Sequence, residues 1–263
     1  GRAQQPNHEW ITDTLDAAAA NAQVEGSDAT YGEETPATRL DNRTQIFRKT
    51  VNVSDTLRAS RNYGLRDYVA YLSTKKAKEL KRDIEFALVG SARQTKVVGD
   101  DSSTAAKLAC AQSFLTDNVN DNGGTARALD ETSIMDVMQQ VYSAGGDPDC
   151  ILINPIHALS IAAFATSGSG TSRDFAQAKT YVNAVDVIRT PFGDIDVILD
   201  RFQDAGSALV IDKEYWRKDV LRATKTTPLA KTGSSTKLMM ETELTLAALN
   251  PKASGMVDDL TTS

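Results

Sequence analysis

Residues 62–90 constrain the fold more than any other part of the sequence, because they predict one uninterrupted helix. The stretch contains no proline, and its two glycines, Gly64 and Gly90, lie near its start and at its end. At ~1.5 Å per residue it would be roughly 40 Å long, far beyond an average helix of about 11–12 residues. Apolar side chains recur on one face at helical spacing: Leu65, Tyr68, Val69, Leu72, Leu80, Ile84, Ala87 and Leu88. We therefore expect a long beam with one buried face.

The opposite face of the predicted helix is basic. Its cations are Lys75, Lys76, Lys78, Lys81 and Arg82. Such a row can simply keep an exposed helix face solvated, or it can contact the phosphates of DNA. The sequence around these residues leaves both interpretations open.

The segment before the helix predicts an extended hairpin. Gly26, Gly32 and Pro36 interrupt any helix there, and residues 50–54 alternate between polar and apolar as a strand does. The first half of the segment is acidic, through Glu25, Asp28, Glu33 and Glu34. An isolated two-stranded hairpin is marginal in water, so it needs a partner surface in its own chain or in another.

Residues 1–20 precede the hairpin and are typical of an arm. Trp10 and Ile11 are the only bulky apolar pair in this stretch. We expect this pair to pin the arm either to a neighbouring copy or to the body of its own chain.

The rest of the chain predicts an α+β module and a strand-rich tail. A short helix is expected over 104–114, and Asp130 is placed to cap a helix that runs to Val141. Strands are expected at 150–153, 184–190, 194–199 and 208–211, with a helix that opens at Asn154-Pro155 and ends at 165. Strand character returns from Trp216, with a polar turn over 231–237 and a strand over 238–249.

Composition indicates a folded protein without naming its function. Hydrophobic residues make up 41% and charged residues 24% of the 263 residues. The formal net charge of −6 argues against a dedicated nucleic-acid binder, but it fits many enzymes equally well. We find no apolar run near the ~18 residues of a membrane helix and no secretory signal sequence. We therefore expect no membrane partner.

Histidine and cysteine are scarce, which leaves little for catalysis or metal binding. His157 opens a predicted helix close in sequence to Cys150, so a catalytic Cys–His pair is conceivable, but no nucleophile context surrounds the cysteine. The alternative is a packed histidine beside buried thiols at Cys110 and Cys150; His8 lies in the arm. No four ligands stand at zinc spacing. We predict no catalytic residue, no cofactor and no metal.

Aspartates gather on two of the predicted strands. Asp194, Asp196 and Asp200 share one face, and Asp186 lies on the strand before. These carboxylates can bind a divalent cation or form the solvent face of a half-buried sheet, and we favour the second interpretation.

The layout and several short segments resemble the major capsid proteins of tailed bacteriophages, which share the Hong Kong 97 fold. The order of arm, extended loop, long helix, two modules and strand-rich tail matches over nearly the whole chain. The segments that carry the resemblance are residues 8–15 and 24–26, residues 53–56 leading to Gly64, and residues 241–246 and 250–253.

The resemblance implies a division of the chain into the parts of that fold. The expected parts are an N-terminal arm (1–20), an E-loop (21–57), a P-domain (58–128) that contains the spine helix (62–90), an A-domain (129–212) and a C-terminal return into the P-domain (213–263). The fold class is therefore α+β, of the Hong Kong 97-like type.

The resemblance also implies a function. Copies assemble, in the host cytoplasm, into hexamers and pentamers of an icosahedral virion shell that encloses double-stranded DNA without sequence-specific binding. Other partners are portal and decoration proteins. The alternatives are an encapsulin-like nanocompartment shell and a soluble enzyme with an unrecognised site.

In such a shell the E-loop of one copy lies across its neighbour. This adds a third interpretation of the basic helix face, as the surface that receives the acidic half of a neighbour's loop. The residues expected at intersubunit contacts are Trp10, Glu25, Asp28, Glu33, Glu34, Lys75, Lys76, Lys78, Lys81 and Arg82.

Overall fold

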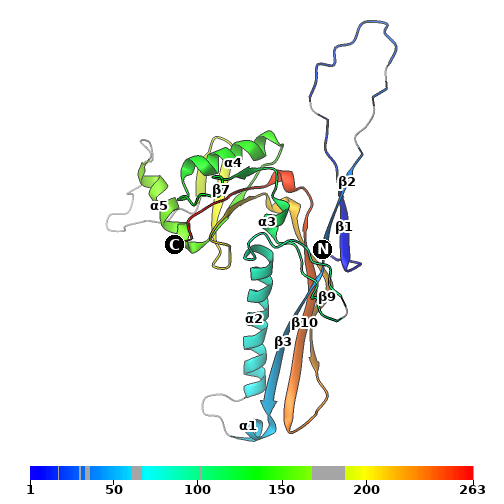
Figure 1. Cartoon of the computed structure of the whole chain (residues 1–263), viewed down its shortest axis with the longest axis vertical. Coiled ribbons are helices and arrows are strands. Elements are labelled where there is room, and N and C mark those ends of the chain that lie inside the picture. Colours follow the sequence, from blue (N-terminus) through cyan, green and yellow to red (C-terminus); the bar gives the residue numbers. More distant parts are fainter. Residues whose placement is uncertain are drawn as a thin grey trace.

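The computed structural model describes residues 1–16, 18–29, 31–32, 36–60, 67–100, 102–167 and 187–262. Within them the chain forms a long finger, a compact α/β body beside one end of it, and a loop that projects the other way (Figure 1). The architecture is α+β, as the sequence predicts.

The finger is a three-stranded antiparallel sheet covered on one face by a long helix. Its strand order is β3 (Gln45–Ser54), β10 (Ser235–Ala248) and β9 (Trp216–Pro228), and α2 (Tyr68–Val89) packs over β3 and β10. Alternate residues of the strands face the helix, as the pleat requires. The core between sheet and helix consists of Phe47, Leu80, Ala87, Leu108, Met240 and Leu244.

The long helix is real but shorter than the predicted 62–90. It has 22 residues and begins at Tyr68, because Asp67 has an extended backbone and its carboxylate accepts the N–H groups of Val69 and Ala70. An aspartate at this position caps a helix rather than continuing one. Residues 61–66 lie outside the described part of the chain. Gly90 ends the helix as predicted, with its N–H donating to the carbonyl of Phe86.

The second body is a six-stranded mixed sheet. Its strand order is β4 (Val119–Asn120), β11 (Gly255–Val257), β8 (Ala208–Ile211), β5 (Cys150–Ile153), β7 (Gly193–Leu199) and β6 (Val187–Thr190). The helix α4 (Glu131–Ser143) covers one face, and its buried side chains Ile134, Val137, Met138 and Val141 form the core with the sheet. The predicted cap by Asp130 is confirmed, since its carboxylate accepts the N–H of Ser133 at 2.9 Å.

Short elements complete the structure. They are α1 (Asp55–Ala59), α3 (Ala111–Phe114), α5 (Ala158–Ser167) and the 3₁₀ turns Pro155–His157, Lys213–Tyr215 and Pro251–Ala253. The predicted helix over 104–114 is wrong for most of its length, because only its last four residues are helical. The preceding residues run extended and are held by long-range bonds: Val97 pairs with Lys107, and Asn42 bonds the backbone of Ala109.

The predicted hairpin over 21–57 also needs correction. Residues 50–54 do form a strand, but it belongs to β3 and pairs with β10 in the finger. The hairpin that carries the loop is formed instead by β1 (Asn7–Thr12) and β2 (Thr38–Arg43). The C-terminal segment is likewise shared, since β9 and β10 build the finger and β11 joins the six-stranded sheet. Alternation reveals a strand but not its distant partner.

A buried amide fixes the hairpin to the body. Asn42 in β2 is completely buried, and its Nδ2 donates to the carbonyls of Leu246 at 2.7 Å and Ala109 at 3.2 Å. Its Oδ1 accepts the N–H groups of Ala109 and Arg43, each at 2.8 Å. A buried polar side chain is stabilising only when it is satisfied in this way.

We expect Asn42→Ala to lower the free energy of unfolding by about 2–3 kcal/mol, because it leaves buried backbone groups of three residues without a partner. Urea denaturation of unassembled subunits measures this. Asn52→Ala is the matched control, since Asn52 is exposed on β3 and its loss is expected to change stability by less than about 0.5 kcal/mol. Equal effects of the two substitutions would contradict the role given to Asn42.

Candidate intersubunit surfaces

The described residues between β1 and β2 (13–16, 18–29, 31–32 and 36–37) belong to a loop that extends from the end of the hairpin, away from the finger (Figure 1). Three apolar side chains in it are exposed: Leu15 (99%), Tyr31 (98%) and Val24 (78%). Large apolar groups that extend into water in this way make the loop a candidate contact surface.

The same loop is uniformly acidic. The sequence from 13 to 37 holds six carboxylates and no lysine, arginine or histidine. Of the predicted contact residues, Glu25 and Asp28 are exposed, whereas Glu33 and Glu34 lie outside the described residues. The loop therefore combines apolar anchors with a single sign of charge.

Trp10, a predicted intersubunit contact, packs instead within its own chain. Its side chain is 9% exposed, and its Nε1 donates to the carbonyl of Ala248 at 2.8 Å. Its ring lies 6.1 Å from that of Phe114, which in turn meets Trp216 at 6.3 Å. The sequence left open whether Trp10 pins the arm to a neighbouring copy or to its own chain. Its burial favours the second alternative, in which Trp10 fixes the root of the loop to its own subunit. The adjacent Ile11 points to solvent and is 70% exposed.

A second contact fixes β1 near its start, where His8 meets the carboxylate of Asp219. The Nε2 of His8 lies 2.6 Å from the Oδ2 of Asp219, and the Nε of Arg217 donates to Oδ1 at 2.7 Å. Asp219 is fully buried. Burial by itself raises the pKa of this carboxyl, but the hydrogen bonds from Arg217 and the amino group of Gly1, with a smaller contribution from His8, outweigh it and lower the pKa below the ordinary value.

The five predicted cations of α2 are in different environments. Lys75, Lys78, Lys81 and Arg82 are exposed, whereas the Nζ of Lys76 is paired with Glu79 at 2.7 Å. Arg82 lies over the ring of Phe202, with its guanidinium carbon 5.3 Å from the ring centroid. Within the described residues, Lys75, Lys78 and Lys81 form no ion pair. These three lysines are therefore available to a partner, whereas Lys76 is paired with Glu79.

A groove of about 630 Å³ runs between α2 and β3, and sequence reasoning did not anticipate it. Its exposed apolar side chains are Phe86 (54%) on the helix and Ile46 (49%) on the strand. Its charged lining is Arg48, Lys49, Glu79, Arg82, Asp83 and Lys107. One signal was present in the sequence: Phe86 is an aromatic residue off the apolar face of the long helix.

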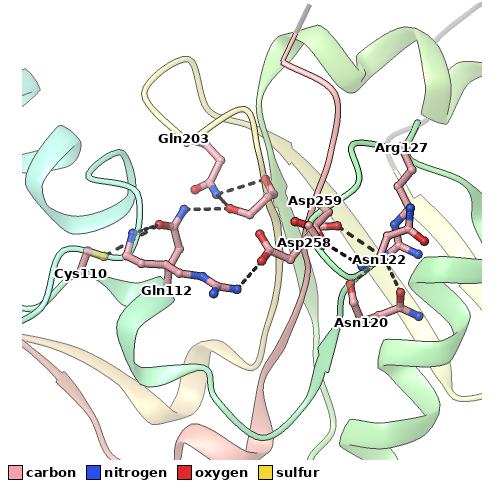
Figure 2. A network of polar contacts seen from close by, with 11 residues as sticks. Cys110, Gln112, Asn120, Asn122, Arg127, Gln203, Asp258 and Asp259 are labelled. Carbon is pink, nitrogen blue, oxygen red and sulfur yellow. Dashed lines mark hydrogen bonds and ion pairs between the residues drawn. The ribbon is translucent and has the colours of Figure 1, made fainter.

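A polar network joins the end of α2 to the six-stranded sheet (Figure 2). Gln112 is 2% exposed; its Nε2 donates to the Oγ of Ser207 at 2.8 Å, and its Oε1 accepts the N–H of Arg93 at 2.7 Å. The guanidinium of Arg93 pairs with Asp258, and the Oδ2 of Asp259 accepts the N–H of Gly124 at 2.7 Å. This network therefore links the finger to the second body through side chains as well as through the chain itself.

The histidine and the two cysteines that were candidates for catalysis are all buried. His157 is 3% exposed and its Nε2 lies 2.7 Å from the carbonyl oxygen of Ala205. Cys110 and Cys150 are buried free thiols, and burial, with the Asp149 carboxylate, raises the pKa of Cys150 to about 12. A thiol held protonated is a poor nucleophile.

The aspartates of the predicted sheet pair with cations rather than with one another. Asp194 is exposed and lies 3.6 Å from Arg189. Asp196 is also exposed and lies 3.7 Å from Lys213. Asp200 accepts the N–H of Phe202 at 2.8 Å, and Asp186 lies outside the described residues. In the part of the chain that the structure describes, no three acidic, histidine or cysteine side chains come close enough to hold a metal ion. Nor is any helix there long and apolar enough to cross a membrane.

Known proteins resemble this chain in sequence and in fold. The major capsid protein of Escherichia phage Phieco32 is 33% identical over an alignment 295 positions long, gaps included, and the alignment covers 94% of this chain and 84% of that protein. A structure from Mycobacterium phage Ogopogo has a TM-score of 0.64 at 13% identity and covers 98% of this chain and 88% of its own. The SrpI encapsulin of Synechococcus elongatus has a TM-score of 0.58 at 9% identity, with 86% and 78% covered.

The fold is that of the Hong Kong 97-like capsid proteins. The family model of the SU10 major capsid protein matches residues 1–261, so the chain belongs to that family and is the major capsid protein of a tailed phage. Its place is the shell of the virion. The family supports a phage shell better than an encapsulin-like nanocompartment.

The ionised state of Asp219 predicts how the root of the loop responds to acid. We expect Asp219→Asn to cost about 1–3 kcal/mol of unfolding free energy at neutral pH. A carboxyl whose folded pKa is lowered stabilises the fold above its unfolded pKa of about 3.9, and this contribution is lost as the pH falls through the folded value. The difference between wild type and variant is therefore expected to shrink below about pH 4.

Urea unfolding of unassembled subunits across this pH range measures the effect. Asp194→Asn removes an exposed carboxylate and serves as the control, with little change at any pH. A wild-type advantage over Asp219→Asn that stays constant down to strongly acidic pH would refute the assignment.

Proposed function

We propose that the chain assembles into hexamers and pentamers that close into an icosahedral shell around double-stranded DNA, through its projecting loop. The observation that carries the proposal is the loop itself, which places Leu15, Val24 and Tyr31 in water on a rigid root. Portal and decoration proteins join the shell at its surface, and the DNA is enclosed without sequence-specific contacts. A structural role of this kind requires no catalytic residue.

Side chains from both strands of the hairpin fix the root of the loop to its own subunit. Trp10, Asn42 and the His8–Asp219 pair tie both strands of the hairpin to the finger. A rooted hairpin keeps its direction, which lowers the entropy lost when the tip docks on a neighbour. Self-association of identical subunits then places each loop on an equivalent surface of the next copy.

The parts of the chain keep their proposed roles, but the strands cross the boundaries expected from the sequence. The arm (1–20) and the projecting part of the E-loop (21–57) contact neighbours, whereas β3 at the end of the E-loop belongs to the finger with most of the P-domain (58–128 and 213–263). The A-domain (129–212), with β4 and β11, faces the centre of a capsomer. The exposed cations Lys75, Lys78, Lys81 and Arg82 supply the charge opposite to that of the loop. Charges at the rim of an interface mainly speed the encounter of the two partners and fix their alignment, and they add less to the affinity.

Replacing residues 14–36 with a short Gly-Ser linker is expected to give a folded subunit that forms no shells. The loop makes no part of either core, so folding is preserved while the intersubunit contact is lost. Sedimentation velocity and negative-stain microscopy measure assembly, and circular dichroism checks the fold. Normal shells from this variant would refute the role of the loop.

A charge exchange tests the cations of α2. Glu25→Lys with Asp28→Lys is expected to slow assembly at low salt, because both loop residues then repel the basic helix. Adding Lys78→Glu and Lys81→Glu to the same chain is expected to restore the rate. Light scattering during assembly at several salt concentrations follows this. Failure of the second pair to restore assembly would exclude α2 as the surface that the acidic residues approach.

A further inference from the structure

We propose that Asn122 is a site of spontaneous deamidation, and that this modification weakens the contact between the turn at residues 121–124 and the C-terminal segment. Asn122 is the only asparagine in the sequence that precedes a glycine, and both residues are exposed. Apart from its chain neighbours, no atom of the described residues lies within 4 Å of the position that a Cβ would take on Gly123. The peptide nitrogen that follows Asn122 is therefore open to water, without the side chain that shields it after other asparagines.

The reaction needs only water and its hydroxide, and asparagine is a thermally labile residue. The backbone nitrogen of Gly123 loses its proton to hydroxide and forms a bond to the Cγ of Asn122. The side-chain nitrogen takes a proton from water, which regenerates the hydroxide, and leaves as ammonia. Water then opens the resulting cyclic imide at one of its two carbonyl carbons. The product is an aspartate or, where the main chain now runs through Cγ, an isoaspartate.

The hydrogen bonds of the turn leave the attacking nitrogen free. The N–H groups of Asn122 and Gly124 both donate to the Oδ2 of Asp259, at 2.9 and 2.7 Å (Figure 2). The N–H of Gly123, which lies between them in the chain, has no acceptor in the described part of the molecule. A hydrogen-bonded amide is protected from base in the solvent, whereas a free one is not. Of the three consecutive amides, the one that has to react is therefore the unprotected one.

The carboxylate of Asp259 joins this turn to the C-terminal segment. Beside it the two segments are paired through their backbones, since Arg127 donates to the carbonyl of Asp259 and Thr261 to that of Arg127, each at 2.8 Å. Leu260 is 3% exposed and belongs to the core of the second body. Asp259 has a φ of 58°, a conformation that costs energy in a residue other than glycine. The two N–H groups of the turn stabilise Asp259 in this conformation.

Deamidation changes both the charge and the geometry of this contact. The Nδ2 of Asn122 donates to the carbonyl of Thr125 at 2.8 Å, and a carboxylate in its place has no proton to donate. Asp259 is itself ionised, because the N–H groups of Asn122 and Gly124 hold its pKa below the ordinary value. A second negative charge in the same turn repels it. In the isoaspartate form the main chain is longer by one carbon, so the two N–H groups no longer converge on one oxygen.

Ageing of the purified subunit at neutral pH tests the modification. Digestion and mass spectrometry measure the conversion of each asparagine, and chromatography separates isoaspartate from aspartate. We expect Asn122 to convert at least about tenfold faster than Asn21, because Asn21 is also exposed in a loop but precedes Ala22, whose Cβ shields the nitrogen. Conversion of the two residues at the same rate would overturn the proposal.

Hydrogen exchange tests the consequence for the C-terminal segment. The reporters are the amides of Asp258, Leu260 and Thr261, which donate to backbone carbonyls of other segments. We expect them to exchange at least about fivefold faster in the aged protein than in the fresh protein. If Asn122 converts and exchange at these amides stays the same, the turn does not hold the segment and the second half of the proposal fails.

Asn122→Gln is the matched control for both measurements. Glutamine keeps the side-chain amide, but its longer side chain has to close a larger ring, so the conversion is expected to be lost. Aged and fresh samples of this variant should therefore show equal exchange, and a faster exchange in its aged sample would assign the effect to damage elsewhere. The turn belongs to the second body, so these outcomes do not depend on the proposed role of the projecting loop.

Discussion

The pairing of β10 with strands from both ends of the chain is the constraint on which the rest of the molecule depends. Its fourteen residues lie between β3, about 190 positions earlier, and β9. Met240 and Leu244 on one face of β10 supply the surface on which α2 packs. The carbonyls of Leu246 and Ala248 near its end hold Asn42 and Trp10, and so the root of the loop. One strand therefore sets the position of both the long helix and the projecting loop.

A second consequence is that the finger and the six-stranded sheet share one core at their junction. Leu246 of β10 shares a core with Leu209 of β8 and Met256 of β11, and Val89 at the end of α2 packs in the same cluster. Gln112 and Ser207 add hydrogen bonds across the same junction. Polar groups that are buried and fully paired specify one arrangement more strictly than apolar contacts do.

Local signals in the sequence predicted local structure well. Asp130 caps α4, Gly90 ends α2, and the alternation over 50–54 marks a strand. What failed was the identity of distant partners, because periodicity describes one segment and not what it pairs with. The same limit explains Trp10: a lone aromatic in a polar arm indicates an anchor, but nothing in the sequence locates Ala248 or Phe114 beside it. Local signals also failed at two places: the cap at Asp67 moves the start of α2, and the helix predicted over 104–114 forms only at Ala111–Phe114.

The candidate intersubunit surface depends both on local sequence signals and on contacts between distant parts of the chain. The cations of α2 were visible in the sequence as a row, but a row does not distinguish Lys76, paired with Glu79, from Lys78, which is free of ion pairs in the described residues. The groove needs β3 beside α2, and that arrangement exists only because β10 brings them together.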